Sequence, residues 1–276
     1  MIQLGGNNVQ ADSLLKEQQW TEAQVETIEK MAASNEVFSY PDQTALQFEL
    51  TLRQYIVQAA KALNASGVSF ATFKKSRCNE KYWNLTDFGG FRIRDGVFPS
   101  DGIQDIYRNG RLYAFECATA MVIVYYRAVL AAIKLPDFNR LFANMLLYDW
   151  HYDQDLGLSS RTGTVMLPGD VVYFKNPDYH PDTPQWQGEN AIVLSNGQYY
   201  GHGIGITDAS RMIRVLNSLR KPDAARSAYL TDTVARPGFA YLQQFKRNTL
   251  SFDAFANRRT GVDRLAGWIG SRYYEV

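Results

Sequence analysis

The feature that most constrains the fold of this chain is a long apolar stretch from Ala114 to Ile133. It contains neither Gly nor Pro, and only Glu116, Thr119 and Arg127 interrupt its apolar character. A segment that is apolar on all sides over this length is typical of a helix buried inside a protein. It is a poor candidate for a membrane span, because an acid and an arginine are costly in lipid. We therefore expect a central helix around which the other elements pack.

Cys117 stands in the first turn of this predicted helix, directly after Glu116. A thiol at a helix N-terminus lies at the positive end of the helix dipole, which favours the thiolate. This position makes Cys117 a candidate nucleophile. The alternative is that Cys117 is a small hydrophobic residue of the core, which is the usual role of a cysteine in an apolar helix.

Composition excludes several classes of protein. At 276 residues and 46% hydrophobic, the chain can bury one substantial core, and its net charge of +1 does not predict a nucleic-acid partner. The N-terminus has no apolar segment of signal-peptide length, so we expect a cytoplasmic protein with no membrane partner. The two cysteines and three histidines show no zinc-ligand spacing, so we expect no metal and no cofactor. A disulfide between Cys78 and Cys117 is disfavoured in such a compartment.

Local signals before the apolar stretch predict helices and one hairpin. A capping box, an Asp before an apolar face and a Pro start are typical of helix N-termini, and a Gly is typical of a helix end. Paired glycines between two short apolar segments are typical of a hairpin. These signals place a helix after Thr21, a helix from Pro41 to Gly67, a strand over 70–73, a hairpin of 81–85 and 91–94, and a short helix from Pro99.

Beyond the apolar stretch the signals change mainly to strands. They place a helix over 136–145, a Pro-Gly-Asp turn at 168–170, a strand over 171–174, an irregular Pro-rich loop over 176–185, strands over 191–194 and 199–200 around an Asn-Gly turn, and a helix after Asp208. The Pro-rich loop is a candidate rim or lid. Helices followed by a cluster of antiparallel strands predict an α+β fold with one core.

The chain is predicted to form a single domain over residues 1–276. Within it, residues 1–36 are interpreted as an N-terminal helical extension and residues 238–276 as a C-terminal extension whose role the sequence does not indicate. Residues 246–276 include Trp268, Tyr273 and Tyr274. Because mobile tails are poor in aromatics, this segment is predicted to pack across the domain as a strap.

The order of these elements resembles the papain-like core of NlpC-type cysteine peptidases. In those enzymes a cysteine begins a helix, a Pro-Gly-Asp turn and a strand follow, and the next two strands carry a histidine and a third polar residue. The resemblance implies a buried Cys helix packed on a small antiparallel sheet and surrounded by further helices. It places Cys117 as the nucleophile, Glu189 where the peptidases have histidine, and His202 as the third polar residue.

The carboxylic acid at position 189 is the informative departure from the peptidase pattern. A carboxylate with an ordinary pKa is a poor base for a thiol, but an apolar pocket raises its pKa toward neutrality. Trp186 is a candidate wall of such a pocket. Structural roles without catalysis stay open for all three residues. Glu189 could pair with a cation at a strand edge, Glu116 could be a solvated partner of the helix dipole, and His202 could be hydrogen-bonded in a turn.

A closer resemblance links the chain to the spore-coat protein-glutamine γ-glutamyltransferases, the calcium-independent transglutaminases of spore-forming bacteria. It spans about 38–232 and rests on the segments SFATF, YAFECATAMVIVYY, LLYDWHY, GDVVYFKNP, QWQGENAIVL, YYGHGIGI and LNSLRKPDAARSAYL. The family's nucleophile is the Cys of FECATA, its acid–base partner is the Glu of GEN, and the Glu of FECATA is a partly redundant partner. By motif these are Cys117, Glu189 and Glu116.

The resemblance implies a catalytic domain that joins a glutamine side chain to a lysine through a Cys117 thioester, with release of ammonia. The implied partners are spore-coat proteins with accessible glutamine and lysine, and the implied location is the coat, after synthesis in the mother-cell cytoplasm. An aromatic tunnel would keep water from the thioester. Trp150, Trp186 and Phe70 are its candidate walls, although apolar core is the simpler interpretation of all three.

Two other functions remain open on the sequence alone. A papain-like peptidase or amidase acting on cell-wall peptide would use the same cysteine and admit water. A structural coat protein could carry an inactive papain-like scaffold. The three functions differ in whether ammonia is released and whether an added amine is incorporated.

Overall fold

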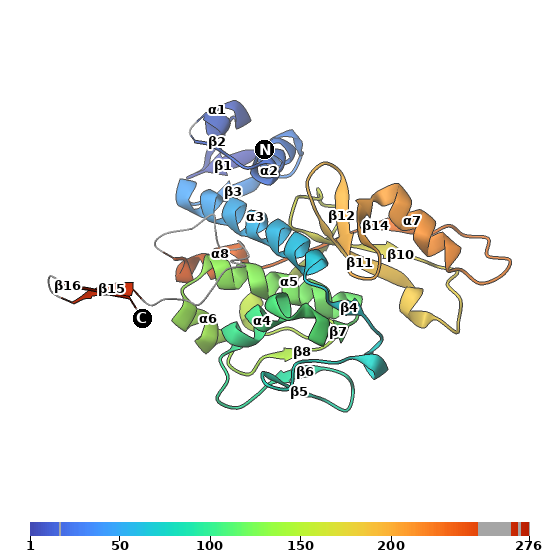
Figure 1. Ribbon diagram of the computed structural model, residues 1–276. Helices are drawn as coiled ribbons and strands as arrows, with labels where there is room; N and C mark the ends of the chain where they lie inside the picture. Colours follow the sequence, from blue (N-terminus) through green and yellow to red (C-terminus); the bar gives the residue numbers. More distant parts are fainter. Residues whose placement is uncertain (17, 248–265, 270–271, 276) are drawn as a thin grey trace.

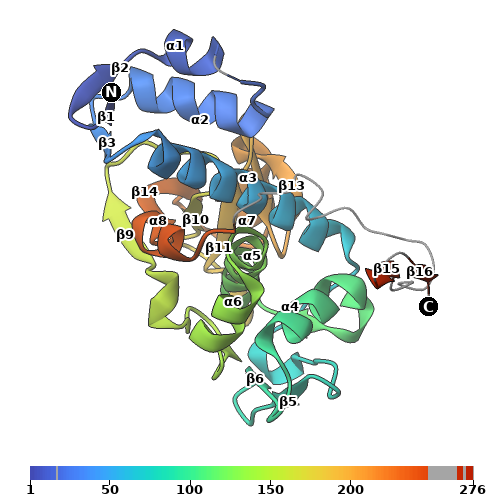
Figure 2. The same ribbon diagram turned by 90° about the vertical axis from the view of Figure 1, so that its left-hand side faces the viewer.

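The computed structural model describes residues 1–16, 18–247, 266–269 and 272–275. Its centre is helix α5 (Cys117–Ala132), which is the apolar stretch singled out in the sequence. Helix α3 (Gln43–Ala65) lies on one side of α5, and helices α4 (Pro99–Arg108) and α6 (Leu135–Leu141) lie on the other (Figures 1 and 2). A sheet packs against α5 through strand β11 (Gly188–Val193). The expected α+β fold with a papain-like core is confirmed.

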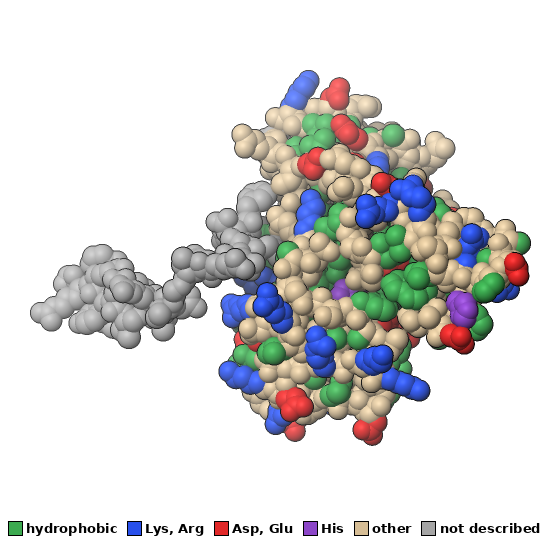
Figure 3. Space-filling model, turned by 45° about the vertical axis from the view of Figure 1, so that its right-hand side comes forward, with side chains coloured by type: hydrophobic (Ala, Val, Ile, Leu, Met, Phe, Trp, Pro, Cys, Tyr) green, Lys and Arg blue, Asp and Glu red, His purple; other side chains and the backbone are tan. Residues whose placement is uncertain are grey.

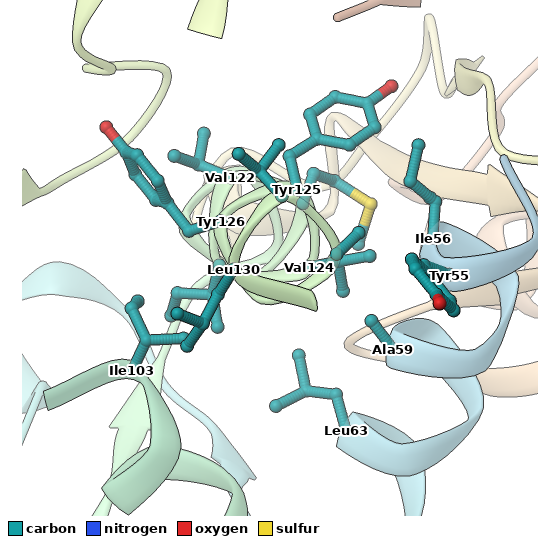
Figure 4. Packing of buried hydrophobic residues seen from close by; sticks show 14 of the residues in the cluster. Tyr55, Ile56, Ala59, Leu63, Ile103, Val122, Val124, Tyr125, Tyr126 and Leu130 are labelled. Atoms are coloured by element: carbon teal, nitrogen blue, oxygen red, sulfur yellow. The ribbon is translucent and has the colours of Figure 1, made fainter. Parts of the chain in front are cut away.

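Helix α5 is buried along its whole length. Of its residues only Arg127 is not buried, and its side chains pack between those of α3 and α4 (Figure 4). Tyr55, Ile56, Ala59 and Leu63 approach it from α3, and Ile103 approaches from α4. The helix begins at Cys117 rather than at Ala114, because Ala114–Phe115 form strand β7, which pairs in parallel with β4 (Ser69–Phe70).

The main sheet has six antiparallel strands in the order β13-β12-β11-β10-β14-β9. Strands β10 (Val171–Lys175) and β11 form its centre and place Glu189 opposite Phe174 and Asn190 opposite Tyr173. The other strands are β9 (Ser159–Thr162), β12 (Gln198–Gly201), β13 (Gly205–Asp208) and β14 (Tyr229–Arg236). Sequence signals missed β9, which is polar and exposed, and β14, whose apolar and polar residues are mostly half-buried or exposed.

Several local predictions are confirmed. Helix α2 (Glu22–Ala33) begins after Thr21, whose backbone N–H donates to Gln24 Oε1 at 3.0 Å. The hairpin of β5 (Trp83–Leu85) and β6 (Phe91–Ile93) forms and is extended by β8 (Leu146–Leu147). Helix α7 (Ala209–Ser218) is capped by Asp208, as expected. The predicted strand over 70–73 is shorter, because a 3₁₀ turn, η1 (Phe73–Lys75), begins there.

Residues 1–36 contain strands as well as the helices that the sequence predicts. Strand β1 (Ile2–Leu4) pairs with β2 (Asn7–Val9) and, in parallel, with β3 (Phe38–Tyr40), and α1 (Ala11–Lys16) follows β2. The side chains of Ile2, Leu14 and Ile28 form a second core that rests on α3 and Leu167. These strands are three residues long, and Ile2 of β1 pairs with Phe38 of β3, which lies 36 positions further along the chain. Local periodicity therefore does not reveal them.

The C-terminal region is described in part. Helix α8 (Phe239–Leu242) and the 3₁₀ turn η5 (Gln243–Phe245) pack against α3, and Arg247 donates to the carbonyls of Leu130 and Ile133 at the end of α5. Strands β15 (Ala266–Ile269) and β16 (Arg272–Glu275) pair with each other. The predicted strap over 246–276 lies mostly outside the described residues.

No helix in the described part of the chain combines the length and the apolar character that crossing a membrane requires.

The Pro-Gly-Asp turn before β10 holds a buried network of charges. Asp170 is fully buried and accepts from Arg53 Nη1 at 2.7 Å and from Arg236 Nε at 2.9 Å. Arg53 also donates to Glu49, which accepts from the hydroxyl of Tyr40. The network therefore joins β3 and α3 to the two strands β10 and β14 of the main sheet, and it fixes the start of β10 against α3.

Replacing Asp170 with Asn should reduce the free energy of unfolding by about 3 kcal/mol or more, because Arg53 would stay buried with Glu49 as its one remaining acidic partner among the described residues. Denaturant unfolding of both proteins measures the change. The matched control is Asp137→Asn, which breaks a pair with the exposed Arg140 and should cost no more than about 1 kcal/mol. Equal losses in the two variants would contradict a structural role for the buried network.

Candidate active site

Cys117 is the first residue of α5, and its side chain is only 7% exposed. Glu116 is the N-cap of the helix. Its Oε1 accepts from the backbone N–H groups of Ala118 and Thr119 at 3.1 and 3.2 Å. The thiol of Cys117 donates to the other carboxyl oxygen, Oε2, at 3.4 Å. One acid therefore both caps the helix and touches the candidate nucleophile.

The environment of Cys117 favours the neutral thiol rather than the thiolate expected from the helix dipole. Burial raises the pKa of Cys117 well above its ordinary value, and the negative charges of Glu189 and Glu116 raise it further. The expectation of a stabilised thiolate was wrong because Glu116 occupies the free N–H groups of the first helical turn and adds a like charge. The Cys117 thiol therefore carries its proton at rest.

Glu189 lies on β11 with its side chain fully buried. Its Oε1 accepts from the N–H of Gly203 at 2.9 Å, and its Oε2 has no hydrogen-bond partner among the described residues. Burial raises the pKa of Glu189 to about 8, and the charge of Glu116 acts in the same direction. At neutral pH Glu189 is therefore a protonated acid with one unpaired oxygen.

The glycines on both sides of His202 make room for Glu189. A Cβ on Gly201 would lie 2.8 Å from Cγ and Oε1 of Glu189, and a Cβ on Gly203 would lie 3.0 Å from the ring of Trp186. Any side chain at either position would displace the acid or the indole. Trp186 therefore borders Glu189 across Gly203. This position agrees with the prediction that Trp186 is a wall of an apolar pocket around Glu189.

His202 follows the end of β12 and is held in place by its own hydrogen bonds. Its Nδ1 lies 3.1 Å from the hydroxyl of Tyr200, its Nε2 lies 3.3 Å from the carbonyl oxygen of Ser69, and its ring stacks on Phe115. Burial lowers the pKa of His202 to about 4, so the ring is neutral. None of its hydrogen bonds reaches Cys117 or Glu189, and a catalytic role for His202 stays a prediction.

Asn190 is a residue of the site that sequence reasoning missed. Its Nδ2 lies 3.5 Å from the sulfur of Cys117, within the range of a donor to sulfur. Asn190 directly follows Glu189 in the GEN segment, and that position was the available signal. Successive residues of a strand point to opposite sides. In agreement, Gly188 and Asn190 line the cavity beside Cys117, whereas Glu189 does not.

A cavity of about 840 Å³ opens beside Cys117. On the face of the molecule shown in Figure 3, hydrophobic side chains gather near the centre. The cavity is bounded by the start of α5, the turn after β8, strands β9, β10 and β14, and the Pro-rich loop, and its lining includes Phe73, Glu116, Cys117, Ala118, Asp149, Trp150, Tyr173, Lys175, Pro184, Gln185 and Asn190. The Pro-rich loop is thus part of the rim.

Of the three candidate aromatic walls, Trp150 lines the cavity. The rings of Trp186 and Phe70 stack on each other at a centroid distance of 5.2 Å, and the ring of Phe70 lies 6.2 Å from the ring of His202. A tunnel walled by all three side chains stays a prediction. No group of three His, Cys, Asp or Glu side chains within the described residues could hold a metal ion.

The protein has a papain-like core, because a helix that starts with a buried cysteine packs on an antiparallel sheet. Two carboxyl groups of raised pKa, Glu116 and Glu189, lie beside this cysteine. The sequence profile of the protein-glutamine gamma-glutamyltransferase family matches residues 1–246. The chain belongs to this family and is an acyltransferase of the transglutaminase class. The match includes the first 36 residues, which the short motifs had left out.

Individual relatives agree with this assignment. The chain is 50% identical over 209 residues to the protein-glutamine gamma-glutamyltransferase of Halalkalibacterium halodurans, covering 76% of this chain and 74% of that protein. It is 50% identical over 206 residues to the enzyme of the same name from Bacillus cereus, covering 75% of each. The solved transglutaminase of Geobacillus stearothermophilus, without its C-terminal extension, superposes with a TM-score of 0.73 at 54% identity, covering 76% of this chain and all of that one.

The protonation state of Cys117 can be measured by its rate of alkylation across pH, in a Cys78→Ser background that leaves one thiol. Glu116→Gln should lower the pKa of Cys117, because it removes a neighbouring negative charge. The exposed and remote acid Glu29 supplies the control variant Glu29→Gln. An unchanged or higher thiol pKa in Glu116→Gln would show that Glu116 does not act on Cys117 electrostatically.

Proposed function

We propose that this enzyme forms isopeptide cross-links through a thioester on Cys117, with Glu189 and Glu116 moving the protons. The observation that carries the proposal is the arrangement of a buried neutral thiol that donates to Glu116 and lies within the electrostatic reach of a protonated, half-unpaired Glu189. Three groups that exchange protons are thus held together where water has little access.

In the first half-reaction the sulfur attacks the carboxamide carbon of a glutamine side chain. The thiol proton passes to Glu116, whose carboxylate already accepts it in a hydrogen bond. Burial raises the pKa of Glu116, which makes its carboxylate a stronger base. Glu189 gives its proton to the leaving nitrogen, so ammonia departs and a thioester remains. Asn190 Nδ2, beside the sulfur, is placed to donate to the oxyanion.

In the second half-reaction a lysine amine attacks the thioester. Glu189, now a carboxylate, accepts a proton from the amine, and Glu116 returns its proton to the departing sulfur. Both acids end as they began, and the product is an ε-(γ-glutamyl)lysine bond. Because Glu189 serves as acid and then as base, its pKa must lie near the working pH, and burial supplies this.

The proposed partners are proteins that present accessible glutamine and lysine, in particular proteins of a spore coat. The motif resemblance supports the coat assignment, together with synthesis in the mother-cell cytoplasm. Detection of the protein in coat extracts of purified spores, and not in the core fraction, tests this location.

We also propose that activity is independent of calcium, so a chelator such as EDTA should leave the rate of cross-linking unchanged.

The cysteine mechanism is tested by measuring ammonia release and amine incorporation with a glutamine peptide. Cys117→Ser should abolish both, whereas the control Cys78→Ser should retain both, because Cys78 lies away from the cavity lining. Mass spectrometry of the enzyme with peptide but no amine should show the peptide attached at Cys117. Cross-linking that survives in Cys117→Ser would refute the mechanism.

The pH dependence of the first half-reaction follows from the pKa of Glu189, which is about 8. The acid form is the proton donor, so the single-turnover rate of ammonia release should fall as pH rises through that value. Glu189→Gln should remove this pH dependence and slow the reaction by about 10²–10⁴-fold. Glu116→Gln should slow it less, since Glu116 handles only the thiol proton. Equal losses would overturn this division of roles.

A further inference from the structure

Three aromatic side chains, of which Phe88 is exposed and Phe73 and Tyr148 are half-buried, form a shelf at the rim of the cavity. Tyr148 stands between the other two, with ring centroids 4.6 Å from Phe73 and 4.7 Å from Phe88. Phe88 is 47% exposed, and Leu85 on the same hairpin is equally exposed. Single exposed apolar residues are common, but a packed group of them is typical of an interaction surface. We call Phe73, Phe88 and Tyr148 the aromatic shelf.

The Gly-Gly turn of the β5–β6 hairpin builds this shelf. Gly89 has a φ of +88°, and a Cβ there would lie 2.1 Å from the carbonyl oxygen of Phe73. A Cβ on Gly90 would lie 2.9 Å from both the ring of Phe88 and the Cβ of Tyr148. Only glycine lets the hairpin tip approach η1 and Tyr148 this closely. The position of Phe88 is therefore determined by close backbone packing.

The shelf is continuous with the cavity beside Cys117. Phe73 belongs both to the shelf and to the cavity lining, and Asp149, which follows Tyr148, also lines the cavity. Asp149 has a φ of 48°, and its backbone N–H donates to Thr119 Oγ1 in the first turn of α5 at 3.0 Å. A chain lying on the shelf therefore has a short path to the sulfur, past the side chain of Asp149.

Charge indicates which substrate would take this path. The acids Asp149 and Glu116 both line the cavity, and the negative charge of Asp149 adds to burial in raising the pKa of Glu116. Among the described residues of the lining the one lysine is Lys175, which ends β10, a different wall of the cavity. An acidic rim attracts an ammonium group and has no such attraction for a neutral carboxamide. The path therefore suits a lysine better than a glutamine.

We propose that the aromatic shelf and Asp149 together bind the lysine-bearing protein, with an apolar side chain next to the lysine on the shelf and the ammonium group directed toward Asp149. This inference rests on the proposed function and assigns a binding surface to one of its two substrates. It places specificity for the sequence around the lysine in the β5–β6 hairpin, away from the residues that carry out the chemistry.

The test uses two lysine peptides that differ in one neighbour of the lysine, Leu or Gly, at a saturating concentration of a glutamine peptide. The intact enzyme should have a lower KM for the Leu peptide. Phe88→Ala should raise the KM for the Leu peptide on the order of tenfold and thereby remove the preference. Asp149→Asn should raise the KM for both lysine peptides, and increasing salt should have a weaker effect on this variant than on the intact enzyme.

Two matched controls separate the shelf from general effects. Phe98→Ala removes an aromatic side chain that is 62% exposed and lies outside both the shelf and the cavity lining, and it should change neither KM. Asp87→Asn removes an exposed negative charge from the same hairpin and should not reproduce the effect of Asp149→Asn. Circular dichroism melts check that each variant folds.

Three outcomes would overturn the inference while leaving the proposed function standing. In the first, Phe88→Ala leaves the KM for the Leu peptide unchanged in an enzyme that still cross-links. In the second, it raises only the KM for the glutamine peptide, which would assign the shelf to the other substrate. In the third, light scattering shows a dimer that Phe88→Ala dissociates, which would make the shelf an interface between copies. By contrast, absence of amine incorporation by the intact enzyme would refute the proposed function itself.

Discussion

The contact between Glu116 and the start of helix α5 is the interaction on which the rest of the site depends. One carboxyl oxygen caps the helix through the N–H groups of Ala118 and Thr119, and the other accepts from the thiol of Cys117. The helix dipole is thereby satisfied by an acid of the protein itself, and the thiol keeps its proton. A cysteine protease with a histidine partner would hold a thiolate here. In this protein the thiol is instead neutral at rest.

Burial raises the pKa of both Glu116 and Glu189, but the two carboxyl groups have different surroundings. Glu189 has no exposed surface, one hydrogen bond to Gly203 and one unpaired oxygen. Glu116 is held by several hydrogen bonds at the helix start. An unpaired oxygen on a protonated acid is costly in a folded protein, and such costs are typical of functional sites. The glycines beside His202 show that the backbone is shaped around this acid. This structural cost supports a functional role for Glu189.

Rigid elements outside the site hold these groups in register. Asp170, buried between Arg53 and Arg236, fixes the start of β10 against α3, and β10 in turn sets the register of β11, which carries Glu189 and Asn190. The nucleophile comes from a helix and its partners from a strand, both buried in one core. Groups on such elements keep their separation better than groups on loops. The loops are left to contact the two substrates, as in the rim at 176–187 and the hairpin that carries Phe88.

The sequence by itself determined the elements whose signals are local. The continuous apolar stretch predicted α5, capping residues predicted α2, α3 and α7, and turn glycines predicted the hairpins. Element order selected Cys117, Glu189 and His202, and the FECATA motif of the family resemblance added Glu116. Tertiary structure alone decided what depends on residues far apart in the chain. It paired the strands at 2–4 and 38–40, gave Asp170 its two arginine partners, brought Asn190 to the sulfur and stacked Trp186 on Phe70. It also decided that the thiol is neutral, because a pKa is set by burial and by charges that come from several elements.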